Sequence, residues 1–345
     1  MLACCDLVRP KMDLKSALML IMMLVALLLM HELPCEQIIL NIIERENVKV
    51  SVCLDSESDR LVGESDDQAR DGVASTAELK EELLRALFRR LGSVVVAYSG
   101  GVDSSYVAYV ANAELGSRAL CVTGESPSLA QYQRAEIDRV VRDFGLHHEI
   151  TQTEEMESPG YRANNADRCY FCKDELYTKL ESIAKSRQIE VIVDGSTTDD
   201  IHDYRPGRQA ARQHAVRSPL IEVGLSKAEV RELSRRVALP TWDKPASPCL
   251  SSRIAYGTPV TIERLNRIDR GEEILREFGF REFRVRHHDT LVRIEIAPTE
   301  MDRALNREIV DSLAQKFREL GFKYVTLDLH GFRSGSLNEA LVPNQ

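Results

Sequence analysis

The 345-residue chain lacks a positive charge balance, since 45 Lys and Arg residues face 54 Asp and Glu residues for a net charge of −9. This balance argues against a large nucleic-acid footprint, although a local basic patch is compatible with it. The chain also lacks an apolar run of the roughly 20 residues that a membrane-spanning helix needs. Its eight cysteines are too widely spread for a disulfide scaffold, which favours metal binding or catalysis.

The most informative stretch is Val94–Ala111, which reads VVVAYSGGVDSSYVAYVA. A β-branched run leads into two glycines, and apolar residues at helix spacing follow, so the pattern predicts strand, tight turn and helix. Ser104 or Ser105 can cap this helix, whose exposed N–H groups and positive end suit a phosphate anion. The GK[ST] ending of a Walker A sequence is missing.

The segment SGGVDS instead resembles the PP-loop of ATP pyrophosphatases, which cleave ATP between the α and β phosphates and leave AMP on the substrate. We therefore expect ATP and Mg²⁺ as cofactors. Asp103 is expected to bind Mg²⁺ or to position the pyrophosphate with Ser99, Ser104 and Ser105. Its alternative role is a carboxylate that favours the start of the helix.

Alternating strand and helix patterns follow the glycine turn and predict a doubly wound, mostly parallel α/β sheet over residues 76–250. Its strands are expected at 94–98, 118–123, 147–152 and 190–194, and its helices at 76–91, 102–115, 129–144, 174–186 and 226–237. Residues 251–345 predict a smaller α+β domain. Its strands are expected at 282–287, 291–297 and 324–329, and its helices at 261–278 and 299–320.

The N-terminal residues 1–75 differ from the rest of the chain. Ala17–Met30 is an apolar run of about 14 residues that fits a signal-peptide core, but no clear A-x-A cleavage site follows. The segment is a targeting sequence, a membrane anchor, or upstream sequence translated from a wrongly assigned start. Because ATP chemistry belongs in the cytoplasm, we favour the last interpretation and expect a disordered or loosely helical leader on a cytoplasmic protein.

In doubly wound sheets, ligands bind beyond the carboxyl ends of the strands. The glycine turn, the turn after Thr123 and the turn Gly195–Asp200 lie at such ends. Asp199 and Asp200 could hold Mg²⁺ or only cap a turn. The expected nucleotide-binding residues are Ala97, Ser99, Gly100, Gly101, Asp103, Ser104, Ser105, Thr123, Gly195, Asp199 and Arg253.

Cys169 and Cys172 form a C-x-x-C pair, and Cys249 follows Pro248 far along the chain. A lone C-x-x-C fits zinc, an iron–sulfur cluster or a redox pair. Three thiolates would leave one iron of a 4Fe-4S cluster open, whereas a structural zinc normally has four protein ligands and no second C-x-x-C exists. Arg284 and Arg286 alternate on a strand, so they could grip a phosphate together or belong to a solvated face.

Several motifs together resemble the LarE family, the ATP-dependent sulfur transferases that make the nickel-pincer nucleotide cofactor. The motifs are AYSGGVDSS, RCYFCK, DGSTTDDIHDYRPG, SPL, PCLSSRIAYGTPVT and GFRSGSLN, and the match covers about 76–336. The resemblance implies adenylation of a carboxylate of pyridinium-3,5-dicarboxylic acid mononucleotide and its conversion to thiocarboxylate. It also implies homo-oligomers, possibly hexamers, and an external sulfide or cysteine-derived sulfur donor.

The resemblance also assigns roles to residues. In one branch of the family a single cysteine, corresponding to Cys249, gives up its sulfur; in another, three cysteines hold a 4Fe-4S cluster. Cys169, Cys172 and Cys249 resemble the three-cysteine branch, with Cys249 catalytic. The resemblance further places the substrate phosphate at Arg284, Arg286 and Arg333, with Glu272 lining that site.

Three other functions compete with this interpretation. A PP-loop tRNA thiolation enzyme would need a basic RNA surface, which the net charge of −9 does not favour. A non-catalytic ATP-binding protein with a structural zinc would bind nucleotide without releasing AMP. An amidotransferase would need an ammonia source, and no glutaminase domain is evident.

Overall fold

The computed structural model describes residues 75–201 and 206–333. The first of its two sheets is a four-stranded parallel sheet with the strand order β3-β2-β1-β4. Its strands are β1 (Val94–Ala97), β2 (Ala119–Glu125), β3 (His148–Gln152) and β4 (Ile192–Val193). The predicted α/β class and parallel sheet are confirmed, and the strand β1 that leads into the glycine turn is central.

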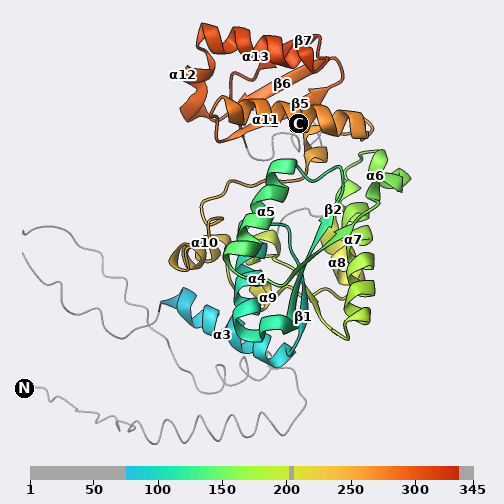
Figure 1. The fold of residues 1–345 in the computed structure, drawn as a ribbon, viewed down its shortest axis with the longest axis vertical. Helices are drawn as coiled ribbons and strands as arrows, with labels where there is room; N and C mark the ends of the chain where they lie inside the picture. The colour runs from blue at the N-terminus through green and yellow to red at the C-terminus, as the bar shows by residue number, and fades with distance from the viewer. Residues whose placement is uncertain (1–74, 202–205, 334–345) are drawn as a thin grey trace, which may run out of the picture. The chain divides into compact units, whose positions relative to one another are not determined.

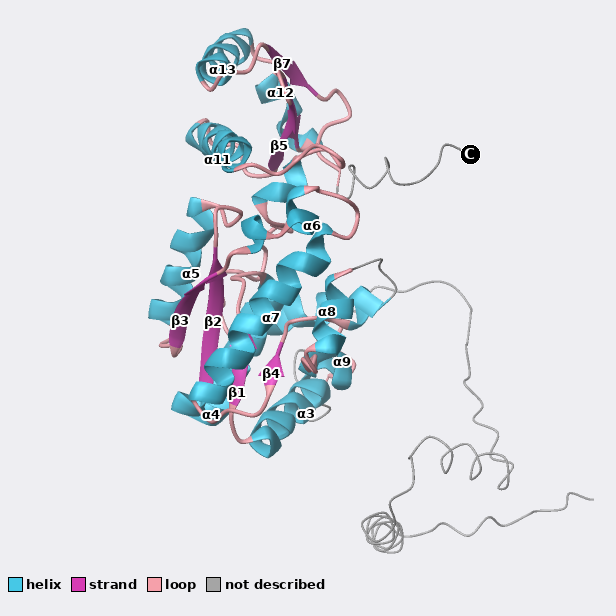
Figure 2. Cartoon of the chain, turned by 90° about the vertical axis from the view of Figure 1, so that its right-hand side faces the viewer, coloured by secondary structure: helices cyan, strands magenta, loops and turns pink. Residues whose placement is uncertain are grey.

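Helices cover both faces of this sheet (Figures 1 and 2). One face packs against α4 (Val102–Leu115) and α5 (Gln131–Asp143), with α3 (Thr76–Leu91) and α10 (Lys227–Arg236) outside α4. The other face packs against α7 (Arg168–Ser186) and α8 (Gly207–Gln213). Two short helices, α6 (Pro159–Arg162) and α9 (Pro219–Glu222), lie in the connections.

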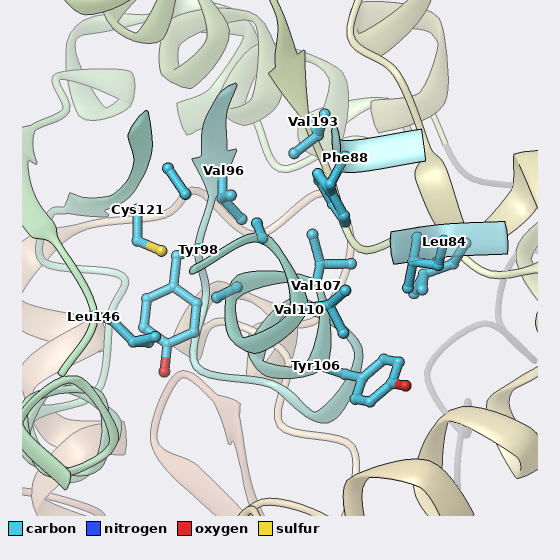
Figure 3. Close-up of a cluster of buried hydrophobic side chains, with 14 of the residues drawn as sticks. Leu84, Phe88, Val96, Tyr98, Tyr106, Val107, Val110, Cys121, Leu146 and Val193 are labelled. Atoms are coloured by element: carbon cyan, nitrogen blue, oxygen red, sulfur yellow. The ribbon is translucent and has the colours of Figure 1, made fainter. Parts of the chain in front are cut away.

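Strand β1 supplies side chains to both layers because alternate residues of a strand point to opposite faces. Val94 and Val96 belong to the core with α3 and α4, whereas Val95 and Ala97 belong to the core with α7. All four residues of the strand are buried, as expected for a parallel strand that is covered on both sides. Figure 3 shows Val96 and Val193 near Phe88 and Val107 in the first of these cores.

Helix α3 begins at a capping box, in which Ser75 accepts from the Glu78 N–H and Glu78 accepts from the Ser75 N–H. The helix ends at Gly92, whose φ of +75° suits glycine. Only some of the apolar residues on this helix are buried. Leu84, Leu87 and Phe88 are buried, but Leu79 and Leu83 are 57% and 58% exposed.

The second sheet has the order β5-β6-β7, with β5 (Phe283–His288) and β6 (Leu291–Ile296) antiparallel and β7 (Tyr324–Leu327) parallel to β6. Helices α11 (Ile262–Glu277), α12 (Met301–Ala304) and α13 (Arg307–Glu319) accompany it. The predicted smaller α+β part is confirmed. Its core also takes in Ala130, Tyr161 and Leu250, so the predicted boundary at residue 250 stays a prediction.

One predicted helix cap and two predicted helix bounds are wrong for local reasons. Helix α4 begins at Val102 with Gly101 as its N-cap, so Ser104 and Ser105 lie inside its first turn and do not cap it. Helix α7 begins at Arg168 instead of residue 174. The helix expected over 299–320 is divided, because the Asn306 side chain accepts from the N–H groups of Glu308 and Ile309 and starts α13.

None of the helices in the described parts of the chain is long and apolar enough to cross a membrane. The expectation for residues 1–75, including the apolar run Ala17–Met30, falls outside the described residues except at Ser75.

Candidate functional site

The glycine turn between β1 and α4 places several polar groups beyond the carboxyl end of the central strand. Gly100 has a φ of +67°, and a Cβ there would lie 2.4 Å from Ile137 Cγ1, so this position requires glycine. The Ser99 and Ser104 hydroxyls are 3.0 Å apart, and Ser104 Oγ also accepts from the Ser99 N–H at 3.3 Å. This turn (Ser99–Ser105) is called the phosphate loop below, since it leads into the positive end of α4.

The ends of the two neighbouring strands meet this loop. Thr123, at the end of β2, donates to the Tyr98 carbonyl at 2.9 Å and lies 2.8 Å from His148 Nε2. Gly195 follows β4, and a Cβ there would lie 2.7 Å from the Ser104 N atom and 3.0 Å from the Asp103 carbonyl carbon. The structure therefore brings Thr123, Gly195 and Asp103 to one edge of the sheet.

The paired acids after β4 have structural partners. Asp199 accepts from the Lys227 N–H at 2.7 Å and so binds the start of α10. Asp200 accepts from the Thr197 N–H at 3.0 Å and pairs with Lys227 Nζ at 2.8 Å. These contacts match the turn-capping alternative, and nucleotide binding by Asp199 stays a prediction.

The C-x-x-C pair lies in the first turns of α7. Cys169, Lys173 and Tyr177 follow one another at four-residue spacing, so they share one face of the helix. Further along this face, Tyr177 and Leu180 pack on the parallel sheet. A helix that follows a parallel strand begins near the carboxyl edge of the sheet, so Cys169 and Cys172 lie at the ligand-binding edge.

Hydrogen bonds connect the start of α7 with the segment that carries Cys249. The buried Arg168 guanidinium donates to the Ser251 carbonyl at 2.8 Å, and the Tyr161 hydroxyl lies 2.5 Å from Ser251 Oγ. Asn164 Nδ2 donates to the carbonyls of Ala255 and Thr258 at 2.8 and 2.9 Å. Two segments far apart in the sequence are thus held together by buried polar groups.

Two of these cysteines, Cys169 and Cys172, have raised thiol pKa values, and Cys249 is among the causes for both. Burial raises the pKa of the Cys172 thiol, and the charge of Cys249 raises it further, while Lys173 opposes both. Cys169 keeps exposed surface, yet the protein around it and then Cys249 raise its pKa, against Arg168 and Lys173. Burial therefore makes the thiolate forms of Cys169 and Cys172 unfavourable, and the nearby cations offset part of this effect.

No three His, Cys, Asp or Glu side chains in residues 75–201 and 206–333 are arranged to hold a single metal ion. In a 4Fe-4S cluster each cysteine binds a different iron, so its ligands stand farther apart than those of one ion. Cluster binding by Cys169, Cys172 and Cys249 stays a prediction.

Arg253 links the segment that carries Cys249 to helix α11. Its guanidinium pairs with Glu272 through Nε and Oε1 at 2.8 Å and donates to the Cys249 carbonyl at 3.0 Å and Ser252 Oγ at 2.9 Å. Both charged groups are buried. Arg253 is thus engaged with protein groups, and its expected contact with nucleotide stays a prediction.

Of the arginines expected to bind the substrate phosphate, Arg284 lies near the Glu272 carboxylate. Burial, then repulsion from Arg253, lowers the pKa of Arg284 to about 10. Its donors reach the Phe283 carbonyl at 2.6 Å and the Ala246 carbonyl, and its guanidinium lies 4.5 Å from the centre of the Phe332 ring. A buried guanidinium with carbonyl partners is electrostatically suited to an anion.

Arg286 and Arg333 have carboxylate neighbours. Arg286 pairs with the fully buried Glu295 at 2.8 Å and donates to the Ser252 carbonyl at 3.1 Å. Arg333 lies 3.9 Å from Asp328, directly after the Phe332 ring that contacts Arg284. Strand β5 therefore carries both Arg284 and Arg286, and Glu272 of α11 lies close enough to affect the charge of Arg284. Arg333 follows Phe332 at the neighbouring turn.

Two buried charged residues near these groups were missed by sequence reasoning. Glu155 accepts from Ser126 Oγ at 2.5 Å and Ser128 Oγ at 2.9 Å, and its charge acts on Cys172. Lys244 contacts the phosphate loop, donating from Nζ to the Gly100 carbonyl at 3.3 Å. A lysine between two prolines just before Cys249 was the available signal for the second residue.

No family model matches the chain. It is 46% identical to an uncharacterised protein of Synechocystis over 264 residues, which is 76% of this chain and 98% of that protein. It is 33% identical to the pyridinium-3,5-bisthiocarboxylic acid mononucleotide synthase of Lactiplantibacillus plantarum over 272 residues, 79% of this chain and 98% of the synthase. An uncharacterised protein of Methanocaldococcus jannaschii is 26% identical over 70% of this chain and 91% of its own length. With this coverage of the synthase, the chain belongs to the LarE family of sulfur transferases.

Proposed function

We propose that the chain adenylates a carboxylate of pyridinium-3,5-dicarboxylic acid mononucleotide with ATP and converts it to thiocarboxylate in nickel-pincer cofactor synthesis. The observation that carries this proposal is the contiguity of three groups. The phosphate loop, the cysteines and the Arg284 cluster all contact the segment Lys244–Arg253 or its direct neighbours. The name of the Lactiplantibacillus relative contains the same pyridinium mononucleotide skeleton.

The first step of this chemistry requires both the phosphate loop and the arginines. A carboxylate is a poor electrophile, and transfer of AMP to its oxygen creates a leaving group. The phosphate loop would hold the ATP phosphates, with Mg²⁺ at Asp103, and release pyrophosphate. Arg284 and Arg286 would bind the phosphate of the mononucleotide and keep its carboxylate in place.

The sulfur must arrive as an anion, because a neutral thiol is a weak nucleophile. Cys169, Cys172 and Cys249 would hold a 4Fe-4S cluster, which when bound supplies an iron that can carry sulfide from an external donor. The chain's own part is to place the three sulfurs, through Arg168 and Arg253, beside the acyl adenylate. Should no cluster be present, Cys249 would be the direct sulfur source.

The test is an anaerobic reaction of the chain with ATP and the dicarboxylic acid mononucleotide. We expect pyrophosphate, AMP and a product whose mass reports exchange of oxygen for sulfur. Asp103→Ala should abolish pyrophosphate release, whereas the control Asp302→Ala, at an exposed position on α12, should not. Unchanged pyrophosphate release in Asp103→Ala would remove Asp103 from the mechanism. If the wild type binds ATP but releases no AMP, the non-catalytic alternative is favoured.

A further inference from the structure

Lys244 is a buried cation on the phosphate loop. Its side chain is 9% exposed, and its Nζ donates to the Gly100 carbonyl at 3.3 Å. The residue lies on the connection between α10 and the Cys249 segment, far from Gly100 in the sequence. A buried ammonium is costly unless it is paired, so a lysine at this position needs a compensating negative charge.

The negative charge comes from Glu136 on α5, whose Oε2 lies 2.6 Å from Lys244 Nζ. The Glu136 side chain is 42% exposed, although the Oε2 atom that faces the ammonium is buried. Tyr132, one turn earlier on α5, has its ring centre 5.5 Å from the same Nζ. Lys244 therefore lies between α5 and the phosphate loop, where an anionic ligand could take the place of Glu136.

The backbone of Lys244 is fixed independently of this ion pair. Its N–H donates to the Thr241 carbonyl at 3.0 Å, and its carbonyl accepts from Arg231 Nη2 at 2.8 Å. Arg231 also donates to the Trp242 carbonyl at 2.8 Å. The backbone that carries the ammonium is thus fixed beside the loop before an anion binds. This lowers the entropy cost of binding an anion there.

We propose that Lys244 binds the pyrophosphate part of ATP, and that Glu136 is the counter-ion that holds Lys244 at the loop until the nucleotide arrives. This inference rests on the proposed function, since it assigns a residue to the same ATP site. The phosphates bring a larger negative charge than one carboxylate, and so outcompete the partly exposed Glu136. Since Cys249 follows Lys244 on the same segment, the residue also links occupancy of the loop with the position of the sulfur site.

The experiment measures binding of ATP, pyrophosphate and AMP to the full chain by calorimetry. Lys244→Met should weaken binding of ATP and pyrophosphate about ten- to a hundredfold, the loss expected for a charged hydrogen bond. Binding of AMP, which lacks the β and γ phosphates, should be unchanged and shows that the variant is folded. Lys244→Arg should lose less than Lys244→Met, and Lys185→Met, at an exposed site on α7, should change nothing.

Glu136→Gln completes the design. It should bind ATP as tightly as the wild type or tighter, because the competing carboxylate is gone. Equal losses for AMP and ATP in Lys244→Met, or no loss for either, would overturn the assignment of Lys244, as would weaker ATP binding in Glu136→Gln. If the wild-type chain itself binds no ATP, the proposed function fails; if it binds ATP and Lys244→Met does too, only this inference fails.

Discussion

Arg253 and Glu272 form a buried ion pair in which one guanidinium joins helix α11 to the backbone carbonyls of Pro248 and Cys249. Glu272 Oε2 also lies 3.4 Å from Arg276 Nη2. Burial alone would raise the pKa of Glu272, but the charges of Arg253, Arg284 and Arg276, with the hydrogen bond from Arg253, together outweigh it, so the pKa lies below its ordinary value of 4.5. The carboxylate is therefore charged at neutral pH and holds the Cys249 segment through Arg253.

Glu272→Gln should destabilise the chain by about 3–5 kcal/mol, the usual effect of removing one member of a buried ion pair. A lowered carboxyl pKa gives stability that is present above the unfolded value and lost as the pH falls through the folded one. The wild type should thus lose more stability than the variant when the pH drops below about 4.5. Urea unfolding at several pH values measures both effects.

The matched control is Glu273→Gln, because Glu273 is the next residue on the same helix and its side chain is 52% exposed. Its pairing with Arg270 at the surface contributes at most about 1 kcal/mol. Equal losses in the two variants would show that Arg253 does not depend on Glu272.

Cys169→Ala, Cys172→Ala and Cys249→Ala should each lower the iron content of anaerobically prepared protein and weaken its brown colour. The reason is that a cluster site with only two remaining thiolates binds poorly. Cys121→Ala is the control, since burial raises the pKa of the Cys121 thiol to about 12 and keeps it protonated within the sheet. One zinc and no iron in the wild type would contradict the cluster. In that event mass spectrometry should show loss of H₂S from the Cys249 peptide after turnover.

His287, on strand β5, gives the second sheet a defined response to acid. Burial, together with Arg264, lowers the pKa of His287 to about 4, so the folded chain keeps this ring neutral. The unfolded chain takes up the proton near pH 6.5. Stability should therefore be complete above about pH 6.5 and should fall as the pH drops towards 4.

His287→Gln should flatten this decline, as measured by melting temperatures between these two pH values. His330→Gln, at an exposed position, should leave the decline as in the wild type. A decline of the same size in all three proteins would show that other groups cause it.

Leu84→Ala should cost about 2–5 kcal/mol of stability, because Leu84 is fully buried between α3 and α4 and its removal leaves a cavity. Leu83→Ala, one residue earlier and 58% exposed, should change the stability by less than about 1 kcal/mol. Similar melting curves for the two variants would contradict the burial pattern of α3.

Local chemistry explains which features were predictable from the amino-acid order. The β-branched run Val94–Val96 and the glycine pair act on the backbone directly, so the strand and the phosphate loop were found at their places. Paired capping boxes at Ser75 and Ser226 likewise mark helix starts through contacts only three residues apart. Such contacts join residues close in the sequence, so they can be predicted from it.

Features that depend on distant contacts were missed. The start of α7 carries no capping side chain, and it is supported by Arg168 reaching Ser251 across the fold. The exposure of Leu79 depends on where α4 and α10 pack against α3. Lys244 became visible as a loop contact only once α5 and the Cys249 segment were placed in space, because nothing near it in the sequence marks that partner.

The central position of β1 also determines which part of the molecule opens last. Its backbone bonds to β2 on one side and β4 on the other, and helices cover both of its faces. Amide protons of Val94–Ala97 can therefore exchange with solvent only when the whole sheet comes apart, whereas those of the edge strand β3 exchange through smaller openings. The phosphate loop begins at the end of this strand, so brief local unfolding elsewhere leaves this end of the sheet intact.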